Sequence, residues 1–452
     1  MKINPQIYRE YDIRGVVDRD LRPDIVRRLG QGFGTYMDRQ GRSRLVVARD
    51  GRLSSKQFGD ALIEGLMSTG RDVMEIGLCP TPIYYFSIFH LDREGGVMVT
   101  GSHNPPQFNG FKVSVGKSTI FGEEIQALRR LTEEGKFATG QGHLSKAGII
   151  PSYQQYVKEH IRLEKRLKVV IDAGNGTGGV VAGPLLRDLG CDVEELYCDV
   201  DGRFPNHFPD PTIPENLKEL IDRVRKRRAD VGVGYDGDAD RIGVVDDLGN
   251  IIWGDQLMIL FSREILKEKK GATFVAEVKC SQNLFNDIES HGGKAIMWRT
   301  GHSLIKKKMK EENAVLGGEM SGHLFFADRY FGYDDAIYAS CRLLELLSKT
   351  DRKISQLLDD VPKTFITPEI RVDCPDDIKF EVVNRVKEEL RKTFSIIDVD
   401  GVRVRFEDGW GLVRASNTQP VLVLRFEALT DKRLQEIKKL VEDHVQAAIT
   451  AS

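Results

Sequence analysis

Apolar residues along the first three quarters of the chain follow two alternating spacings. Short runs rich in β-branched residues predict strands at 45–50, 73–76 and 96–100, and helical spacing predicts a helix over 54–69. The same alternation continues further along. It predicts a charged helix over 153–165, strands over 167–172, 229–234, 273–276, 294–298 and 314–317, and a long helix over 334–348. Strands that alternate with helices in this way predict mixed α/β domains.

The pattern changes near Thr364. Segments 366–372, 396–406, 411–415 and 421–428 alternate or run apolar with gaps of hairpin length, and an amphipathic helix follows from Asp431. These segments predict a smaller C-terminal α+β domain with an antiparallel sheet. The expected domains are residues 1–149, 150–250, 251–364 and 365–452.

Length and charge restrict the class of protein. At 452 residues the chain is too long for a single core. A net charge of −2 with 30% charged residues indicates neither nucleic acid nor a membrane as partner, and no apolar run approaches the roughly 18 residues of a membrane span. The first residues lack the apolar segment of a signal peptide. Six cysteines without CxxC spacing favour free thiols and a cytoplasmic location over a zinc site.

The first candidate for chemistry is a turn that ends the strand predicted at 96–100. It reads Thr100-Gly101-Ser102-His103-Asn104 and is closed by two prolines, which cannot continue regular structure. The turn places one hydroxyl at a rigid strand end beside an imidazole and an amide. Ser102 is therefore a candidate nucleophile or phosphorylated residue, and a plain Ser/Asn turn is the alternative.

The second candidate is an acidic loop after the strand predicted at 229–234. Asp236, Asp238 and Asp240 alternate with small residues, so that their oxygens can converge on a hard cation such as Mg²⁺ or Ca²⁺. The competing EF-hand needs a glycine after the third acid and a distant glutamate. Arg241 and an apolar run follow directly here, which excludes it.

Two polar loops complete the set. Glu319, Ser321 and His323 lie on a glycine-rich loop between apolar runs, where they can bond the hydroxyls of a sugar. Arg414 begins a turn between two strands, and its guanidinium offers paired donors to a phosphate. The turn adds the small polar side chains of Ser416, Asn417 and Thr418.

A further glycine-rich segment points to another class of protein. Gly174, Gly176 and Gly179 fit the G-x-G-x-x-G pattern after a strand, and two glutamates follow about 20 residues on. A nicotinamide-dependent oxidoreductase is therefore an alternative. A tight turn that lets a helix approach the sheet is the interpretation we prefer, because the other motifs are unrelated to hydride transfer.

Taken together, the four loops, in this order and spacing, resemble the α-D-phosphohexomutase superfamily over essentially the whole chain. The sequence Glu319-Met320-Ser321-Gly322-His323 is similar to that of the bacterial phosphomannomutase/phosphoglucomutase type. Phosphoglucosamine mutases typically have Gln in place of Met320 and remain the alternative. The resemblance implies three related α/β domains and a smaller fourth around a central cleft. It also implies exchange of phosphate between C1 and C6 of mannose or glucose through a phosphoserine and a hexose 1,6-bisphosphate.

The resemblance also implies roles for residues. Ser102 would carry the phosphoryl group and, with Asp236, Asp238 and Asp240, hold Mg²⁺. The remaining catalytic candidates are His103, Lys112, Arg241 and His302, with Lys112 and His302 as alternatives for the base. The candidates for substrate binding are Tyr11, Arg14, Lys279, Glu319, Ser321, His323, Arg414, Ser416, Asn417 and Thr418. Glucose 1,6-bisphosphate is the expected activator, hexose phosphates are the expected ligands, and a monomer or dimer is expected.

Overall fold

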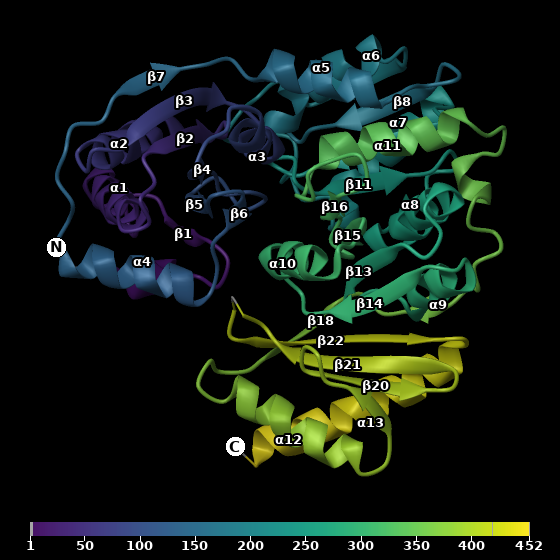
Figure 1. Cartoon of the computed structure of the whole chain (residues 1–452). Helices are drawn as coiled ribbons and strands as arrows, with labels where there is room; N and C mark the ends of the chain where they lie inside the picture. The colour runs from purple at the N-terminus through teal and green to yellow at the C-terminus, as the bar shows by residue number, and fades with distance from the viewer. Residues whose placement is uncertain (1–2, 418, 452) are drawn as a thin grey trace.

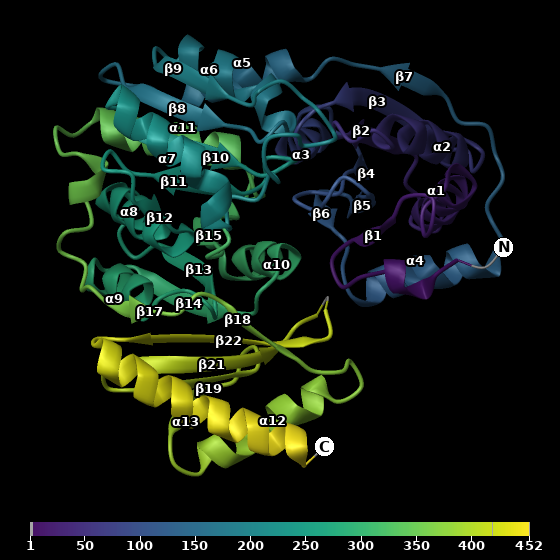
Figure 2. The same cartoon turned by 180° about the vertical axis from the view of Figure 1, so that it is seen from behind.

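The computed structural model describes residues 3–417 and 419–451, which form four β-sheets with helices around them (Figure 1). The first sheet lies on one side of the molecule, the second and third lie on the other, and the fourth lies below the third (Figures 1 and 2). The chain thus traces an arc, and the expected fold of three mixed α/β domains followed by an α+β domain is confirmed.

The first sheet is mixed. Its order is β1-β5-β4-β2-β3-β7, with β6 paired to β5. The four neighbouring strands β4, β2, β3 and β7 run parallel to one another. The strands are β1 Ile13–Val16, β2 Arg44–Arg49, β3 Asp72–Leu78, β4 Gly95–Val99, β5 Phe108–Val115, β6 Ser118–Thr119 and β7 Leu144–Lys146. The helices are α1 Pro23–Asp38, α2 Ser55–Met67, α3 Thr81–His90 and α4 Glu123–Glu134.

The second sheet has the order β12-β11-β10-β8-β9, with a parallel centre and two antiparallel strands at one edge. The strands are β8 Lys168–Asp172, β9 Asp192–Leu196, β10 Val231–Tyr235, β11 Ile242–Val245 and β12 Ile251–Ile252. The helices are α5 Ile150–His160, α6 Ala182–Asp188 and α7 Lys218–Arg227.

The third sheet has the order β14-β13-β15-β16, and only its last pair is antiparallel. The strands are β13 Thr273–Glu277, β14 Lys294–Trp298, β15 Leu316–Gly318 and β16 Leu324–Phe326. The helices are α8 Gly254–Glu268, α9 Gln282–Ser290, α10 His302–Glu312 and α11 Ala336–Ser348.

All pairs in the fourth sheet are antiparallel. The order is β17-β22-β21-β20-β19, with β18 also paired to β22. The strands are β17 Phe365–Ile366, β18 Ile370–Asp373, β19 Ser395–Ile397, β20 Val402–Phe406, β21 Gly409–Ala415 and β22 Val421–Ala428. The helices are α12 Lys379–Arg391 and α13 Asp431–Thr450, which is capped by the Thr430 side chain.

Three expected elements differ from the structure. The helix expected over 153–165 is α5, which begins earlier because Pro151 suits a first helical turn and ends at His160. The strand expected over 366–372 is two strands separated at Pro368, whose nitrogen cannot donate to the ladder. The strand expected over 396–406 is a hairpin, β19 and β20.

The candidate loops follow strands that end toward the same region. The Ser102 turn follows β4, the acidic loop follows β10, and the Glu319 loop follows β15. Parallel sheets present ligand-binding loops at the carboxyl ends of their strands, so the three loops occupy equivalent positions in three sheets. Among the described helices, none is both long and apolar enough to span a membrane.

Candidate active site

The loop that carries Ser102 is held in an unusual backbone conformation by its neighbours. Ser102 has φ of 50°, a left-handed value that costs energy for a residue other than glycine. Its N–H donates to Thr100 Oγ1 at 2.9 Å and its carbonyl accepts from Arg52 at 2.8 Å. The buried Arg52 guanidinium also donates to three other carbonyls of this loop, those of Asn104, Pro105 and Phe108. Arg52, to which no sequence motif pointed, therefore organises the loop.

The Ser102 hydroxyl points toward the acidic loop of the second sheet. It donates to Asp236 Oδ2 at 3.0 Å and lies 3.1 Å from His103 Nδ1. Burial, followed by the charges of Arg241 and Arg14, holds the pKa of His103 well below its usual value. Burial thus favours the neutral ring, and because the Ser102 proton is directed at Asp236, a proton on His103 Nδ1 can be donated to Ser102 Oγ.

The three aspartates of the acidic loop converge. Each is at most 1% exposed, and one oxygen from each lies within 4.8 Å of the others. Asp238 Oδ1 and Asp240 Oδ1 are buried without a hydrogen-bond partner. Burial, followed by repulsion from Asp240 and Asp238, raises the pKa of Asp236 well above its usual value. Crowded carboxylates with unpaired oxygens have the chemistry of a site for a hard divalent cation.

Lys112 reaches the same carboxylates from β5 in the first sheet. Its Nζ lies 2.7 Å from Asp238 Oδ2 and also pairs with Asp240. Burial lowers the pKa of Lys112, but the two aspartates outweigh it and raise the pKa overall. Burial conversely raises the pKa of Asp238, and Lys112 brings it below its usual value. The lysine is therefore a cation that favours the ionised form of Asp238 and also pairs with Asp240.

Two glycines allow the loops to approach. A Cβ on Gly237 would lie 2.4 Å from the Ser102 carbonyl oxygen, and one on Gly176 would lie 2.7 Å from the Gly237 carbonyl oxygen. Thr177 N donates to the same Gly237 oxygen at 3.0 Å. Gly176 thus packs against the acidic loop, whereas a Cβ on Gly174 or Gly179 would meet Pro209 or Cys198, so close packing against three segments accounts for these glycines.

Arg241 and His323 form the next layer of the site. Arg241 Nε donates to His323 Nε2 at 3.0 Å, and His323 Nδ1 lies 3.1 Å from Asp334 Oδ2. Burial lowers the pKa of His323, but Asp240 and Asp334 outweigh it and raise the pKa overall. An imidazolium could not accept the bond from Arg241, however, so this geometry requires the neutral ring with its proton on Nδ1.

His302 lies beside His323, and Gly301 just before it donates to Glu319. Its ring stacks against that of His323 and meets that of Tyr11 edge-on, both at 5.8 Å between centroids. Burial, followed by the charge of Lys306, holds the pKa of His302 well below its usual value. His302 is therefore an unprotonated base, whereas Lys112 has no lone pair to offer.

The loop after β15, which carries Glu319, Ser321 and His323, is held by hydrogen bonds. Glu319 Oε1 accepts from Gly301 N at 2.7 Å, and Oε2 accepts from Ser321 Oγ at 3.2 Å. Glu277, at the end of β13, accepts from Met320 N at 2.8 Å. Lys279 lies 3.6 Å from Glu277 and 3.2 Å from Glu369. Glu277 thus holds the loop after β15, and Lys279, just after β13, contacts the segment between β17 and β18 of the fourth sheet.

Tyr11 joins three parts of the chain. Its hydroxyl donates to the Thr300 carbonyl at 2.9 Å and accepts from Asn417 Nδ2 at 2.9 Å. Arg414 Nε donates to Asp400 Oδ2 at 3.0 Å, and the same oxygen accepts from Thr300 N at 3.0 Å. The loop after β21 therefore reaches both the first and the third sheets.

The other predicted residues lie beside these contacts. Arg14 donates to Asn104 Oδ1 at 3.1 Å, next to the Ser102 turn. Ser416 is buried and accepts from Gln419 N at 3.2 Å, inside the loop that follows Arg414. Thr418 lies outside the described residues.

Four residues of this region were not predicted from the sequence. Arg52, Glu277, Asp334 and Asp400 belong to none of the four motifs, and the contacts that place them in this region are made to other loops of the chain. Asp334 had one local signal, because Asp334-Asp335 directly precedes a predicted helix, and aspartate is a common helix N-cap.

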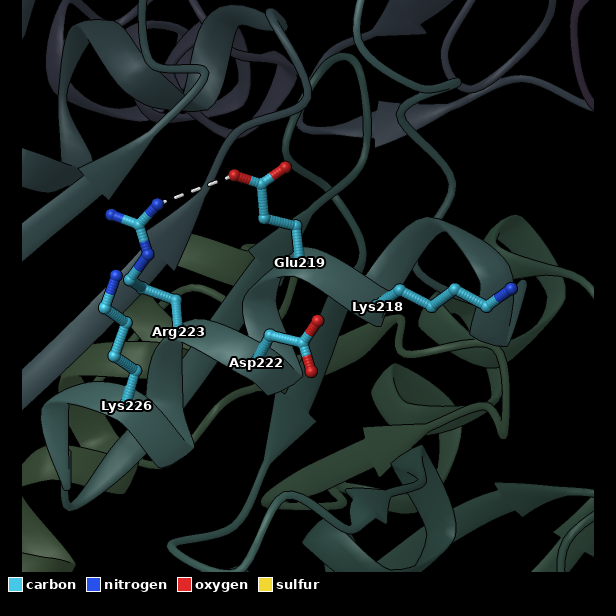
Figure 3. A pocket seen from close by; sticks show the side chains of 5 residues that line it. All are labelled: Lys218, Glu219, Asp222, Arg223 and Lys226. Atoms are coloured by element: carbon cyan, nitrogen blue, oxygen red, sulfur yellow. Dashed lines mark ion pairs between the residues drawn. The ribbon is translucent and has the colours of Figure 1, made fainter.

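A separate surface pocket lies on α7, away from these loops. Its lining is charged, with Arg223 and Glu219 3.6 Å apart (Figure 3). The lining residues are Lys218, Glu219, Asp222, Arg223 and Lys226. None of the residues predicted for the site lines this pocket.

Four family models match successive parts of the chain. Residues 5–139, 151–249 and 253–365 match the phosphoglucomutase/phosphomannomutase alpha/beta/alpha domains I, II and III. Residues 369–444 match the C-terminal domain of the same family.

Individual proteins match over nearly their whole length. A phosphomannomutase/phosphoglucomutase of Pseudomonas aeruginosa is 46% identical over 442 residues, which cover 98% of this chain and 96% of that protein. A phosphoglucomutase of Neisseria gonorrhoeae is 43% identical and covers 96% of each. A solved phosphoglucomutase/phosphomannomutase family protein from Burkholderia thailandensis is 40% identical, with a TM-score of 0.95, and the match covers 99% of this chain and 98% of that one.

Proposed function

The chain belongs to the phosphoglucomutase/phosphomannomutase family, and from this premise we propose that it interconverts hexose 1-phosphates and hexose 6-phosphates through phospho-Ser102. The observation that carries the proposal is the position of the Ser102 hydroxyl. It lies on a rigid loop 3.0 Å from Asp236 and beside a neutral imidazole, where three aspartates converge. This is the arrangement that phosphoryl transfer to and from a serine requires.

Mannose and glucose phosphates are the proposed substrates. Glu319 and Ser321 offer acceptor and donor groups to vicinal hydroxyls, and Met320 lies between them. The relatives that share the whole length with the chain are named for mannose and glucose, which favours these sugars over glucosamine. Lys279 pairs with Glu277, which accepts from Met320 N, and His323 ends the same loop, so we propose both as further substrate-binding residues.

The acidic loop fits a magnesium ion. Asp236, Asp238 and Asp240 supply only oxygen ligands, and two of those oxygens are buried without a partner. A phosphoryl oxygen on Ser102 would complete the set. When bound, Mg²⁺ neutralises charge on the phosphoryl oxygens. Lys112 and Arg241 add fixed positive charge around the same point.

Each half of the reaction breaks one P–O bond and forms another. The bond between phosphorus and Ser102 Oγ breaks, a bond to a sugar hydroxyl oxygen forms, and the hydroxyl proton passes to a base. We assign the base to His302, because burial keeps it neutral while Lys112 is held as a cation. The bisphosphate then turns around, and its other phosphoryl group returns to Ser102. His103 orients the Ser102 oxygen between the two steps.

The phosphate that is not reacting needs a second pocket. Arg414 is buried and aligned by Asp400, and Ser416 and Asn417 lie on the turn that follows it, so we propose this turn for that phosphate, together with Thr418. Tyr11 holds Asn417 in place, and Arg14 lies beside the Ser102 turn.

Regulation and location follow from the chemistry. An unphosphorylated Ser102 needs a phosphoryl donor, so glucose 1,6-bisphosphate is the proposed activator. Six free cysteines fit a reducing cytoplasm, and we propose that the protein acts there as a monomer or dimer.

The test is a coupled assay with Mg²⁺ and trace hexose bisphosphate that compares the 1-phosphates of glucose, mannose and glucosamine. We expect turnover of the first two, and a loss of roughly 10³-fold or more in Ser102→Ala because the acceptor oxygen is gone. Ser262→Ala, which removes a buried hydroxyl within α8, should retain full activity. Unimpaired turnover by Ser102→Ala would refute the covalent scheme, and a preference for glucosamine 1-phosphate would refute the sugar assignment.

A further inference from the structure

Asp334 is a buried carboxylate at the meeting point of three basic side chains. It is 0% exposed and lies just before α11. Its Oδ2 is 3.1 Å from His323 Nδ1 and 4.0 Å from His302 Nδ1, and its Oδ1 accepts from Lys306 Nζ at 3.2 Å. A carboxylate shared in this way can fix the orientation of the rings beside it.

The contacts continue from Asp334 to a guanidinium beside the acidic loop. Arg241 Nε donates to His323 Nε2 at 3.0 Å. Because a guanidinium nitrogen can only donate, His323 must present a lone pair at Nε2 and carry its proton on Nδ1. This nitrogen lies 3.1 Å from Asp334 Oδ2, within ion-pair distance but without aligned hydrogen-bond geometry, and 3.7 Å from Asp240 Oδ1, so Asp334 is the nearer carboxylate. Replacing that acceptor would release the ring to adopt the other tautomer, in which Nε2–H would oppose the Arg241 donor.

This arrangement leaves the two terminal nitrogens of the Arg241 guanidinium for a ligand. Its backbone N–H donates to Asp236 Oδ1 at 3.2 Å, which ties Arg241 to the acidic loop. Since Nε is occupied by His323, the two terminal nitrogens are the donors that can address a phosphoryl group near Ser102. A guanidinium stabilises transferring phosphate only when its planar fork is aimed at the oxygens.

Asp334 is itself presented by a rigid anchor. The next residue, Asp335, caps α11 by accepting from Tyr338 N at 2.8 Å. It also accepts from the hydroxyls of Tyr153 at 2.9 Å and Tyr330 at 2.7 Å. The backbone at Asp334 is thus fixed by a capped helix and by contacts with α5.

We propose that Asp334 is a positioning residue for phosphoryl transfer, which sets the tautomer of His323 and thereby aims the Arg241 guanidinium at the phosphoryl group. The proposal rests on the mutase function proposed above. It assigns Asp334 a role that differs from mere compensation of the buried charge on Lys306.

The test compares Asp334→Asn with Asp335→Asn in the full-length protein. Asp334→Asn should lower kcat about 10- to 100-fold, the usual effect of removing an orienting carboxylate, with KM changed less than about threefold. Asp335→Asn, one residue further along, removes a buried carboxylate that does not contact His323. Its amide oxygen can still accept from Tyr338 N and cap α11, so the anchor of Asp334 is retained and kcat should stay within about twofold. A kcat within twofold of wild type in Asp334→Asn would overturn the proposal.

A spectroscopic readout follows the tautomer without requiring turnover. In ¹⁵N spectra of the nine histidines, assigned with His323→Gln, the wild type and Asp335→Asn should show His323 protonated at Nδ1. Asp334→Asn should shift the ring toward Nε2–H. An unchanged His323 tautomer in Asp334→Asn would refute the proposal. Because this signal is read in the resting protein, it remains decisive even if the mutase assignment fails.

A double variant separates positioning from charge compensation and guards against misfolding. Asp334→Asn leaves Lys306 as an unpaired buried cation, whereas Asp334→Asn with Lys306→Met removes both charges. We expect the double variant to fold and to retain the loss in kcat. Recovery of wild-type kcat in the double variant would show that Asp334 serves only to neutralise Lys306.

Discussion

One apolar cluster extends across the first three units, beside a second cluster confined to the first unit, whereas, within the part of the chain that the structure describes, the fourth unit shares no cluster as large with the others. A single cluster of buried apolar residues runs from Val46 in the first sheet to Ile354 after α11. The fourth has a separate cluster, from Cys374 to Ala448. Aromatic rings pack across the joint between the first three units, such as Phe86 with Tyr153, 5.5 Å between centroids.

The joint to the fourth sheet is mainly polar. Among the described residues, the apolar cluster there consists of the buried Val278, Trp410 and Leu412, with Met297 and Val399 packed against them. Around them Arg403 donates to the carbonyls of Val278 at 2.6 Å and Cys280 at 2.9 Å. Packed apolar joints resist displacement, whereas polar contacts can be exchanged for water. The comparison indicates that Ser102 and the acidic loop belong to a rigid body, and that the Arg414 loop belongs to a part that can move and close over the ligand.

Removing Arg403 should break the polar joint and has the largest expected effect on stability. Arg403→Met leaves two buried carbonyls unsatisfied and loses a contact with the Trp410 ring, at 3.8 Å, for a cost of about 2–4 kcal/mol. Denaturant unfolding should then show an earlier, separate transition for the fourth unit. The control is Arg405→Met, which replaces an exposed arginine on the same strand. A single transition with an unchanged midpoint in Arg403→Met would contradict the comparison.

The two kinds of region also differ in what the sequence could predict. The Ser102 turn, the acidic loop and the alternating elements were found because their chemistry and spacing are local. Arg52 was not, because it acts on carbonyls about 50 residues away. Likewise α5 ends at His160 because Arg162 N and Glu164 N bond to Glu345 and Ser348 of α11, partners that no local pattern shows.

In the fourth unit, the sequence was misleading for a different reason. Its antiparallel sheet was expected, but the hairpin of β19 and β20 was expected as one strand. Helix α12 was not expected, because it lies between segments that alternate like strands. The break at Pro368 could have been predicted, since proline interrupts a strand ladder. Interactions between distant parts of the chain account for the other differences.

Arg414→Ala tests the part of the site that lies on the fourth unit. Loss of charge-assisted bonds worth about 1.5–3 kcal/mol should raise KM for hexose phosphate roughly 10- to 100-fold, with a smaller change in kcat. Arg433→Ala, which removes a partly exposed ion pair with Asp408 in the same unit, should leave both constants within twofold. If kcat fell and KM stayed constant, Arg414 would belong with the chemistry of the rigid body instead.

The smallest expected effect is the contribution of Asp335 to the pH dependence of the free energy of unfolding. Asp335 lies where α11 meets α5, and it therefore tests the packing between the first three units. Burial raises its pKa from 3.8 to about 6, so the folded protein holds this proton more tightly than the unfolded chain does. The free energy of unfolding should therefore fall as pH rises from about 4 to about 6, by on the order of 1 kcal/mol once relaxation of the site is allowed for. Asp335→Asn removes this dependence, so its stability relative to wild type should rise across that interval and stay level above it. Denaturant midpoints between pH 4 and pH 8 measure the difference, with Asp351→Asn as the control because its carboxylate is fully exposed. A constant difference across that range would mean that Asp335 is charged throughout, and that water reaches the joint which the apolar packing is expected to keep dry.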